Sequence, residues 1–108
     1  MQNKKTVNIL GTKWTVVQKE FKEDYIDGYT DYTIHEIDIR SNNIGDVADF
    51  EELMKQNLRH EIIHAFLAES GLRANWEHSM CGHDETVVDW IAIQFPKILK
   101  VYEELGCL

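Results

Sequence analysis

The chain has 108 residues and a mass of 12.6 kDa, so we expect a single domain spanning residues 1–108. Acidic residues outnumber basic ones by 19 to 11, and the formal net charge of −8 argues against binding to nucleic acid. No apolar run approaches the length of a membrane span, and residues 1–6 do not resemble a signal peptide. Because Cys81 and Cys107 define no disulfide framework, we expect a protein of the reducing cytoplasm.

Residues 1–40 carry the patterns of short β-strands. Segments 7–10 and 13–19 flank Gly11-Thr12 and predict a hairpin, in which Trp14 and Val16 share one face. Further strands are expected at 28–32 and 36–40, with a tight turn at 33–35 because strict alternation fails there. We expect these strands to form a small antiparallel sheet of three or four strands.

Residues 46–105 carry helical patterns, so the expected fold class is α+β. A first helix is expected from about Asp49 to Ser70, with Asp46 or Asp49 as its N-cap and Gly71 in the left-handed conformation that ends many helices. An irregular connection over 72–83 should lead to a second helix capped by Asp84, which Pro96 should kink or divide.

Large aromatic side chains at strand and helix spacing are expected in the core rather than around a cofactor. The apolar segment 98–108 either closes this core or forms an interface, and the sequence does not assign an oligomeric state. The aromatic residues expected in the core are Trp14, Phe50, Phe66, Trp90 and Phe95.

The first helix contains the motif H-E-x-x-H as His60-Glu61-Ile62-Ile63-His64. Residues four apart lie on one helix face, so both imidazoles can point at one metal ion, while Glu61 can reach a water bound to that ion. Apolar residues surround the motif and predict a helix buried on all sides, where these polar groups need partners. A zinc ion with its water would be such a partner, and a buried polar network without metal is the alternative.

A catalytic zinc needs a third protein ligand and an open fourth position. Glu85 and Asp89 lie four residues apart on the second helix, and we expect Glu85 to be the third ligand. Asp89 would then accept the ring N–H of a ligating histidine. The alternatives are a Glu85 that only stabilises the helix dipole and an Asp89 in an ordinary hydrogen bond between helices. His83 is the rival third ligand, and Cys81 is more simply a buried thiol than a ligand.

The motif and the carboxylates that follow it resemble those of gluzincins, zinc metallopeptidases with H-E-x-x-H on one helix and a glutamate on the next. Segment 28–39 resembles the strand–turn–strand before the active helix in small members such as ImmA/IrrE-like and SprT-like peptidases. Segments 60–72 and 85–98 resemble small proteins encoded by phages and prophages. The resemblance implies a minimal zincin-like fold, one Zn²⁺ per chain, a peptide or protein substrate and, for a phage protein, the host cytoplasm. No Gly-x-x-His extension follows His64, so the resemblance does not extend to metzincins.

The resemblance implies a hydrolytic mechanism. In this hypothesis His60, His64 and Glu85 hold the zinc, which lowers the pKa of a bound water. Glu61 accepts the proton of that water as general base and delivers it to the leaving amine.

Other parts of the hypothesis depend on the surroundings of the motif. Three residues are candidates for stabilising the oxyanion: Tyr32, His78 and His83. The strand at 36–40 is expected to pair with an extended peptide substrate, and Trp76 to cover one side of the cleft or pack in the core. The alternative function is a non-catalytic zinc-binding or protein-interaction module. The presence of Glu61 favours an enzyme, because a purely structural zinc site needs no base.

Overall fold

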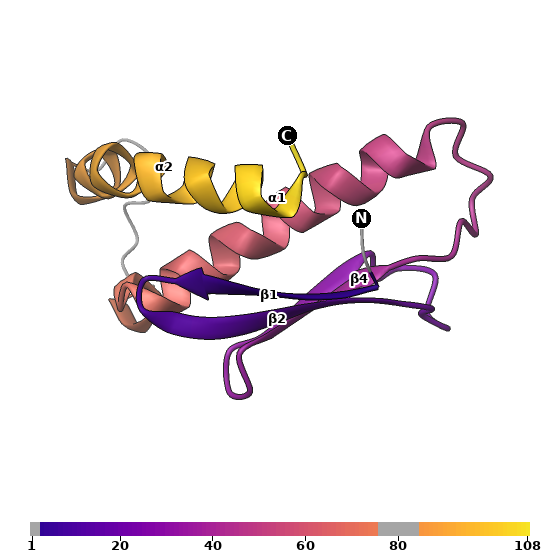
Figure 1. The fold of residues 1–108 in the computed structure, drawn as a ribbon, viewed down its shortest axis with the longest axis horizontal. Helices are drawn as coiled ribbons and strands as arrows, with labels where there is room; N and C mark the ends of the chain where they lie inside the picture. The colour runs from indigo at the N-terminus through magenta and orange to yellow at the C-terminus, as the bar shows by residue number, and fades with distance from the viewer. Residues whose placement is uncertain (1–2, 76–84) are drawn as a thin grey trace.

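The computed structural model describes residues 3–75 and 85–108. Four strands, β1 (Lys4–Ile9), β2 (Thr12–Lys19), β3 (Gly28–Asp31) and β4 (Glu36–Arg40), form one sheet. Two helices, α1 (Phe50–Glu69) and α2 (Glu85–Leu105), lie on the same face of this sheet, and a 3₁₀ helix, η1 (Leu72–Asn75), follows α1 (Figure 1). The expected α+β class is confirmed. Within these helices the description leaves out the side chains of Ala74, Asn75, Glu85, Val88, Asp89 and Ala92.

The sheet is mixed, with the strand order β1-β2-β4-β3. β1 and β2 form the expected antiparallel hairpin, and β3 and β4 are also antiparallel, but β2 and β4 run parallel from Thr15 beside Glu36 to Lys19 beside Arg40. The expectation of an antiparallel sheet was therefore wrong. Four consecutive residues of β4, 37–40, are buried, whereas no residue of β3 is, so β4 with its two core isoleucines takes the centre of the sheet and β3 takes the edge.

The first helix has the expected boundaries. The Asp49 side chain accepts the backbone N–H of Glu52 at 3.1 Å, as an N-cap does, and Gly71 adopts a φ of +82° just beyond the C-terminal Ser70. The expected turn before β4 is also present, with His35 at a φ of +55°.

The core lies between the sheet and the two helices. Trp14 and Val16 share its sheet side, as expected, and Phe66 is buried on α1. The C-terminal segment contributes to this core, which is the first of the two roles that the sequence left open for it. The exposed Phe95 contradicts its predicted burial, and among the α2 residues whose burial is described the first buried one is Ile98. The buried apolar residues are Val7, Ile9, Trp14, Val16, Ile37, Ile39, Leu58, Ile62, Ala65, Phe66, Ile98, Val101, Leu105 and Cys107.

Pro96 lies inside α2 without dividing it. Figure 1 shows the first turns of α2 closer to end-on than its last turns, so the helix bends along its length, as the proline predicts. The connection expected to be irregular begins with η1, while Asp84, the predicted cap of α2, lies outside the described residues. In the part of the chain that is described, neither helix combines the length and apolarity needed to cross a membrane.

Candidate metal centre

The H-E-x-x-H motif occupies the middle of α1 and divides into an exposed and a buried part. His60 and His64 are exposed, with 68% of the His60 side chain accessible, whereas only 11% of the Glu61 side chain is. The expectation of a helix buried on all sides was therefore wrong, because the sheet covers one face of α1 and leaves the two imidazoles facing outward. A catalytic metal site must nevertheless keep one ligand position open for water or substrate, and exposed imidazoles are compatible with this requirement.

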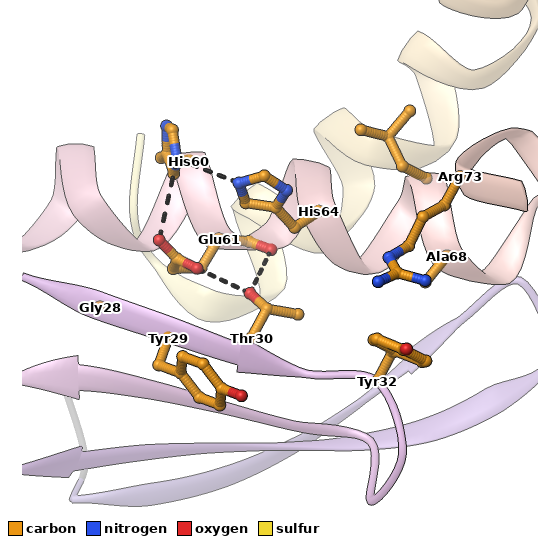
Figure 2. Close-up of a pocket in the computed structure, with 10 residues that line it drawn as sticks. Gly28, Tyr29, Thr30, Tyr32, His60, Glu61, His64, Ala68 and Arg73 are labelled. Carbon is orange, nitrogen blue, oxygen red and sulfur yellow. Dashed lines mark hydrogen bonds and ion pairs between the residues drawn. The ribbon is translucent and has the colours of Figure 1, made fainter. Parts of the chain in front are cut away.

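The two imidazoles face each other across one turn of α1. Their Nε2 atoms are 3.2 Å apart, and the ring centroids are separated by 4.9 Å with the planes at 71° (Figure 2). Two nitrogens bound to one tetrahedral zinc at about 2.0–2.1 Å lie roughly 3.3–3.4 Å apart, so the pair fits this ion. The same distance also suits a hydrogen bond between neutral imidazoles, which is the arrangement of the metal-free alternative.

The Glu61 carboxylate is held between α1 and the edge strand β3. The Thr30 hydroxyl donates to Glu61 Oε1 at 2.8 Å and contacts the Glu61 backbone carbonyl at 3.1 Å (Figure 2). Gly28 permits this approach, since a Cβ there would lie 2.9 Å from Glu61 Cγ. The other carboxylate oxygen, Oε2, lies 3.9 Å from His60 Nε2. Glu61 therefore has a fixed position next to the imidazole that would carry the metal.

Thr30 and Gly28 were not among the residues singled out from the sequence. A glycine at the start of a strand often marks a place where another chain segment approaches closely, and this signal was available at Gly28. Nothing local in the sequence distinguishes Thr30, because its role depends on β3 lying beside α1.

A cleft of about 660 Å³ opens over the motif between α1, β3 and η1. Tyr32, a predicted candidate for stabilising the oxyanion, lines this cleft, and the guanidinium of Arg73 stacks on its ring at 3.8 Å from the centroid. Arg73, like Thr30 and Gly28, was not among the residues singled out from the sequence. The cleft is lined by Gly28, Tyr29, Thr30, Tyr32, His60, Glu61, His64, Leu67, Ala68 and Arg73.

Neither candidate for the predicted third ligand is among the side chains that the structure describes, and within them no group of three potential metal ligands is found. Glu85 is the first residue of α2 and Asp89 follows one turn later, but both side chains lie outside the description. The remaining sequence candidates around the site also lie outside it: Trp76, His78, Cys81 and His83.

The strand predicted to pair with substrate cannot do so. β4 is hydrogen-bonded to β2 on one side and to β3 on the other, so it offers no free edge. The edge strand beside the cleft is β3, from which Gly28, Tyr29 and Thr30 line the cavity.

A second polar cluster fixes the end of α1 that follows the motif. The Glu69 carboxylate accepts hydrogen bonds from the Thr12 hydroxyl and from the indole of the fully buried Trp14, both at 2.9 Å. His35 Nε2 lies 3.6 Å from the same carboxylate. These contacts attach the C-terminal end of α1 to the sheet.

Charged groups on β4 are separate from the cleft. Lys19 pairs with the largely buried Asp38 at 2.8 Å, and this contact raises the lysine pKa. A hydrogen bond with Asp38, together with desolvation and the charge of Asp38, raises the pKa of Glu36 above its ordinary value of 4.5. None of these residues lines the cavity over the motif.

Comparison of the chain with protein-family models, with curated proteins and with solved structures gave no match.

Proposed function

We propose that the protein is a zinc-dependent metallopeptidase. The proposal rests on one observation: two imidazole nitrogens 3.2 Å apart face a cleft on one turn of α1, with the Glu61 carboxylate fixed beside them. A metal site that serves only structure is closed, whereas this pair is exposed to a cavity large enough for a short peptide.

Each side chain of the motif has a role in this proposal. His60 and His64 would hold the metal, and Glu85 at the start of α2 is the proposed third protein ligand. When bound, Zn²⁺ would supply Lewis acidity and lower the pKa of a water to about 7. Glu61 accepts a proton from the attacking water at its carboxylate and returns it to the leaving amine.

The neighbouring groups orient this base. By donating to Oε1, Thr30 leaves Oε2 as the oxygen on the His60 side of the carboxylate, where the proton is exchanged. We propose Asp89 as the acceptor for a ring N–H of a ligating imidazole, and Tyr32, His78 and His83 stay candidates for stabilising the oxyanion.

The substrate is proposed to be a peptide or an extended protein segment. Its backbone would pair with the free edge of β3, which replaces the strand 36–40 in this role. Strand addition at this edge brings a peptide bond past Thr30 and therefore past Glu61.

The substitution Glu61→Gln tests the chemistry. It keeps the size of the side chain and the acceptor for Thr30 but removes the base, so we expect bound zinc to be retained and cleavage of an internally quenched peptide library to be lost. Glu51→Gln, an exposed glutamate in the first turn of the same helix, is the matched control and should cleave like the wild type. Equal cleavage by Glu61→Gln and wild type would refute the mechanism. Zinc binding without cleavage by the wild type would favour the non-catalytic zinc-binding or protein-interaction module.

A further inference from the structure

The end of the cleft away from His60 holds an aromatic ring and a permanent positive charge. Arg73 lies with its guanidinium 3.8 Å from the centroid of the Tyr32 ring, and both residues line the same cavity as the motif (Figure 2). Tyr32 comes two residues after Thr30, in the turn just beyond the end of β3. The charge therefore lies in the same cleft as the Glu61 carboxylate, at the end marked by Tyr32.

Local structure holds both partners in place. Gly71, with its φ of +82°, turns the chain at the end of α1, and η1 then brings Arg73 over the cleft. The Asp31 carboxylate accepts the backbone N–H of Thr33 at 3.0 Å and also its hydroxyl, which fixes the turn that carries Tyr32. These hydrogen bonds lower the pKa of Asp31, so the turn keeps its charged acceptor at neutral pH.

Arg73 differs from the other two arginines of the chain in what its donors contact. Arg40 donates to the backbone carbonyls of Phe21, Glu23 and Ile26. Arg59 donates to the Cys107 carbonyl at 2.7 Å and lies 3.4 Å from the Glu52 carboxylate. Among the described residues, Arg73 contacts the face of an aromatic ring, and no carboxylate is paired with it.

A guanidinium stacked on a ring keeps its N–H donors free at its edge. These donors lie in one plane and match the two oxygens of a carboxylate, and stacking reduces the freedom that binding would otherwise remove. Because the chain as a whole carries a net charge of −8, an exposed arginine over the cleft creates a local positive site on an acidic protein.

We propose that Arg73, stacked on Tyr32, is a specificity-determining subsite that binds a carboxylate of the substrate on the Tyr32 side of the bond placed at Glu61. The carboxylate is either the free C-terminus of a peptide or an Asp or Glu side chain. The position relative to the bond rests on the proposed peptidase function, whereas carboxylate binding by Arg73 does not.

The test measures peptide binding rather than cleavage. The ¹⁵N-labelled full chain, with and without added Zn²⁺, is titrated with acetyl-Ala-Ala-Ala as the free acid and as the C-terminal amide. A second pair of peptides, acetyl-Ala-Glu-Ala amide and acetyl-Ala-Gln-Ala amide, presents the charge on a side chain. The arginine Nε signals report binding, and the Arg73 signal is identified by its absence in Arg73→Gln and Arg73→Lys.

The expected result is a shift of the Arg73 signal with the charged member of at least one pair and none with its neutral partner. The peptide that binds more tightly identifies the C-terminal or the side-chain source. Arg73→Gln should weaken binding by about tenfold or more, Arg73→Lys less because it keeps the charge, and the exposed Lys13→Gln not at all. Backbone amide spectra of the variants verify that they fold.

Three results would overturn the subsite: no shift at millimolar peptide, equal binding of charged and neutral peptides, or unchanged affinity in Arg73→Gln. The two proposals fail separately. Carboxylate binding without bound zinc or cleavage would refute only the peptidase, whereas zinc-dependent cleavage with an unaltered preference in Arg73→Gln would refute only the subsite.

Discussion

Thr30→Val tests whether β3 positions the base of the motif. Valine has the shape of threonine but removes the hydroxyl that donates to Glu61 Oε1 at 2.8 Å. A hydrogen bond to a charged group contributes about 1.5–3 kcal/mol, and water can replace this one only in part because 11% of the Glu61 side chain is exposed. Valine also favours strands by a few tenths of a kcal/mol, so we expect a loss of about 1.5 kcal/mol. For a chain of this size the melting temperature should fall by about 6–12 °C.

The assay is thermal and urea unfolding at pH 7, followed by circular dichroism. Thr30→Ser keeps the hydroxyl and should cost less than about 1 kcal/mol, which separates the hydrogen bond from packing. In the Glu61→Ala background, Thr30→Val should cost less than half of its value in the wild type. An equal cost in both backgrounds, or a serine variant as unstable as the valine variant, would show that Thr30 does not hold Glu61.

Two further substitutions test the close approach at β3 and the charge balance on β4. Gly28→Ala places a Cβ 2.9 Å from Glu61 Cγ and should destabilise the fold by about 1–3 kcal/mol in urea unfolding. Gly45→Ala, whose Cβ would make an ordinary contact at 3.9 Å with Val47 Cγ2, should change the stability by less than about 0.5 kcal/mol. Equal effects of the two substitutions would contradict the crowding at Gly28. Hydrogen bonding with Asp38 raises the pKa of Glu36, so the folded protein favours the protonated form of this side chain. The resulting contribution to the free energy of unfolding is present below pH 4.5 and is lost as the pH rises through the folded-state pKa. Glu36→Gln, which donates at every pH, should therefore be more stable than the wild type at pH 7 by up to about 1 kcal/mol, and melting curves should converge towards pH 4. If the stability gain of Glu36→Gln were the same at pH 4 and pH 7, protonation of Glu36 would be excluded as its cause.

Local features of the fold could be predicted because they depend on neighbours in the sequence. Asp49 and Gly71 mark the ends of α1, and they do so through hydrogen bonding and backbone conformation within a few residues. The motif residues His60 and His64 share a helix face for the same reason, since the helical period alone places them one turn apart.

The pairing of β2 with β4 and the exposure of the motif depend on contacts between distant segments, and the predictions of an antiparallel sheet and of a fully buried helix both failed. The alternation of apolar and polar residues in β4 does not indicate that this strand pairs with β2. The position of a strand in the sheet depends instead on how much apolar surface it buries against the core. The apolar residues around His64 predicted complete burial, yet the sheet covers only one side of α1. Thr30 of β3 contacts Glu61 of α1, and Arg73 of η1 stacks on Tyr32, so both act on residues distant in the sequence and no local pattern identified them.

Bound metal, measured by elemental analysis of the untagged protein, tests the central proposal most directly. His60→Ala and Glu85→Ala are measured beside it, together with Glu51→Ala as a control on an exposed glutamate of α1. We expect about one zinc per chain in the wild type and the control, and its loss in the other two variants. If zinc were lost in His60→Ala but kept in Glu85→Ala, Glu85 would not be the third ligand, and His83 would be the next candidate. A wild type that binds no metal in excess zinc would contradict the proposed peptidase and leave the His60–His64 contact as a hydrogen bond between imidazoles.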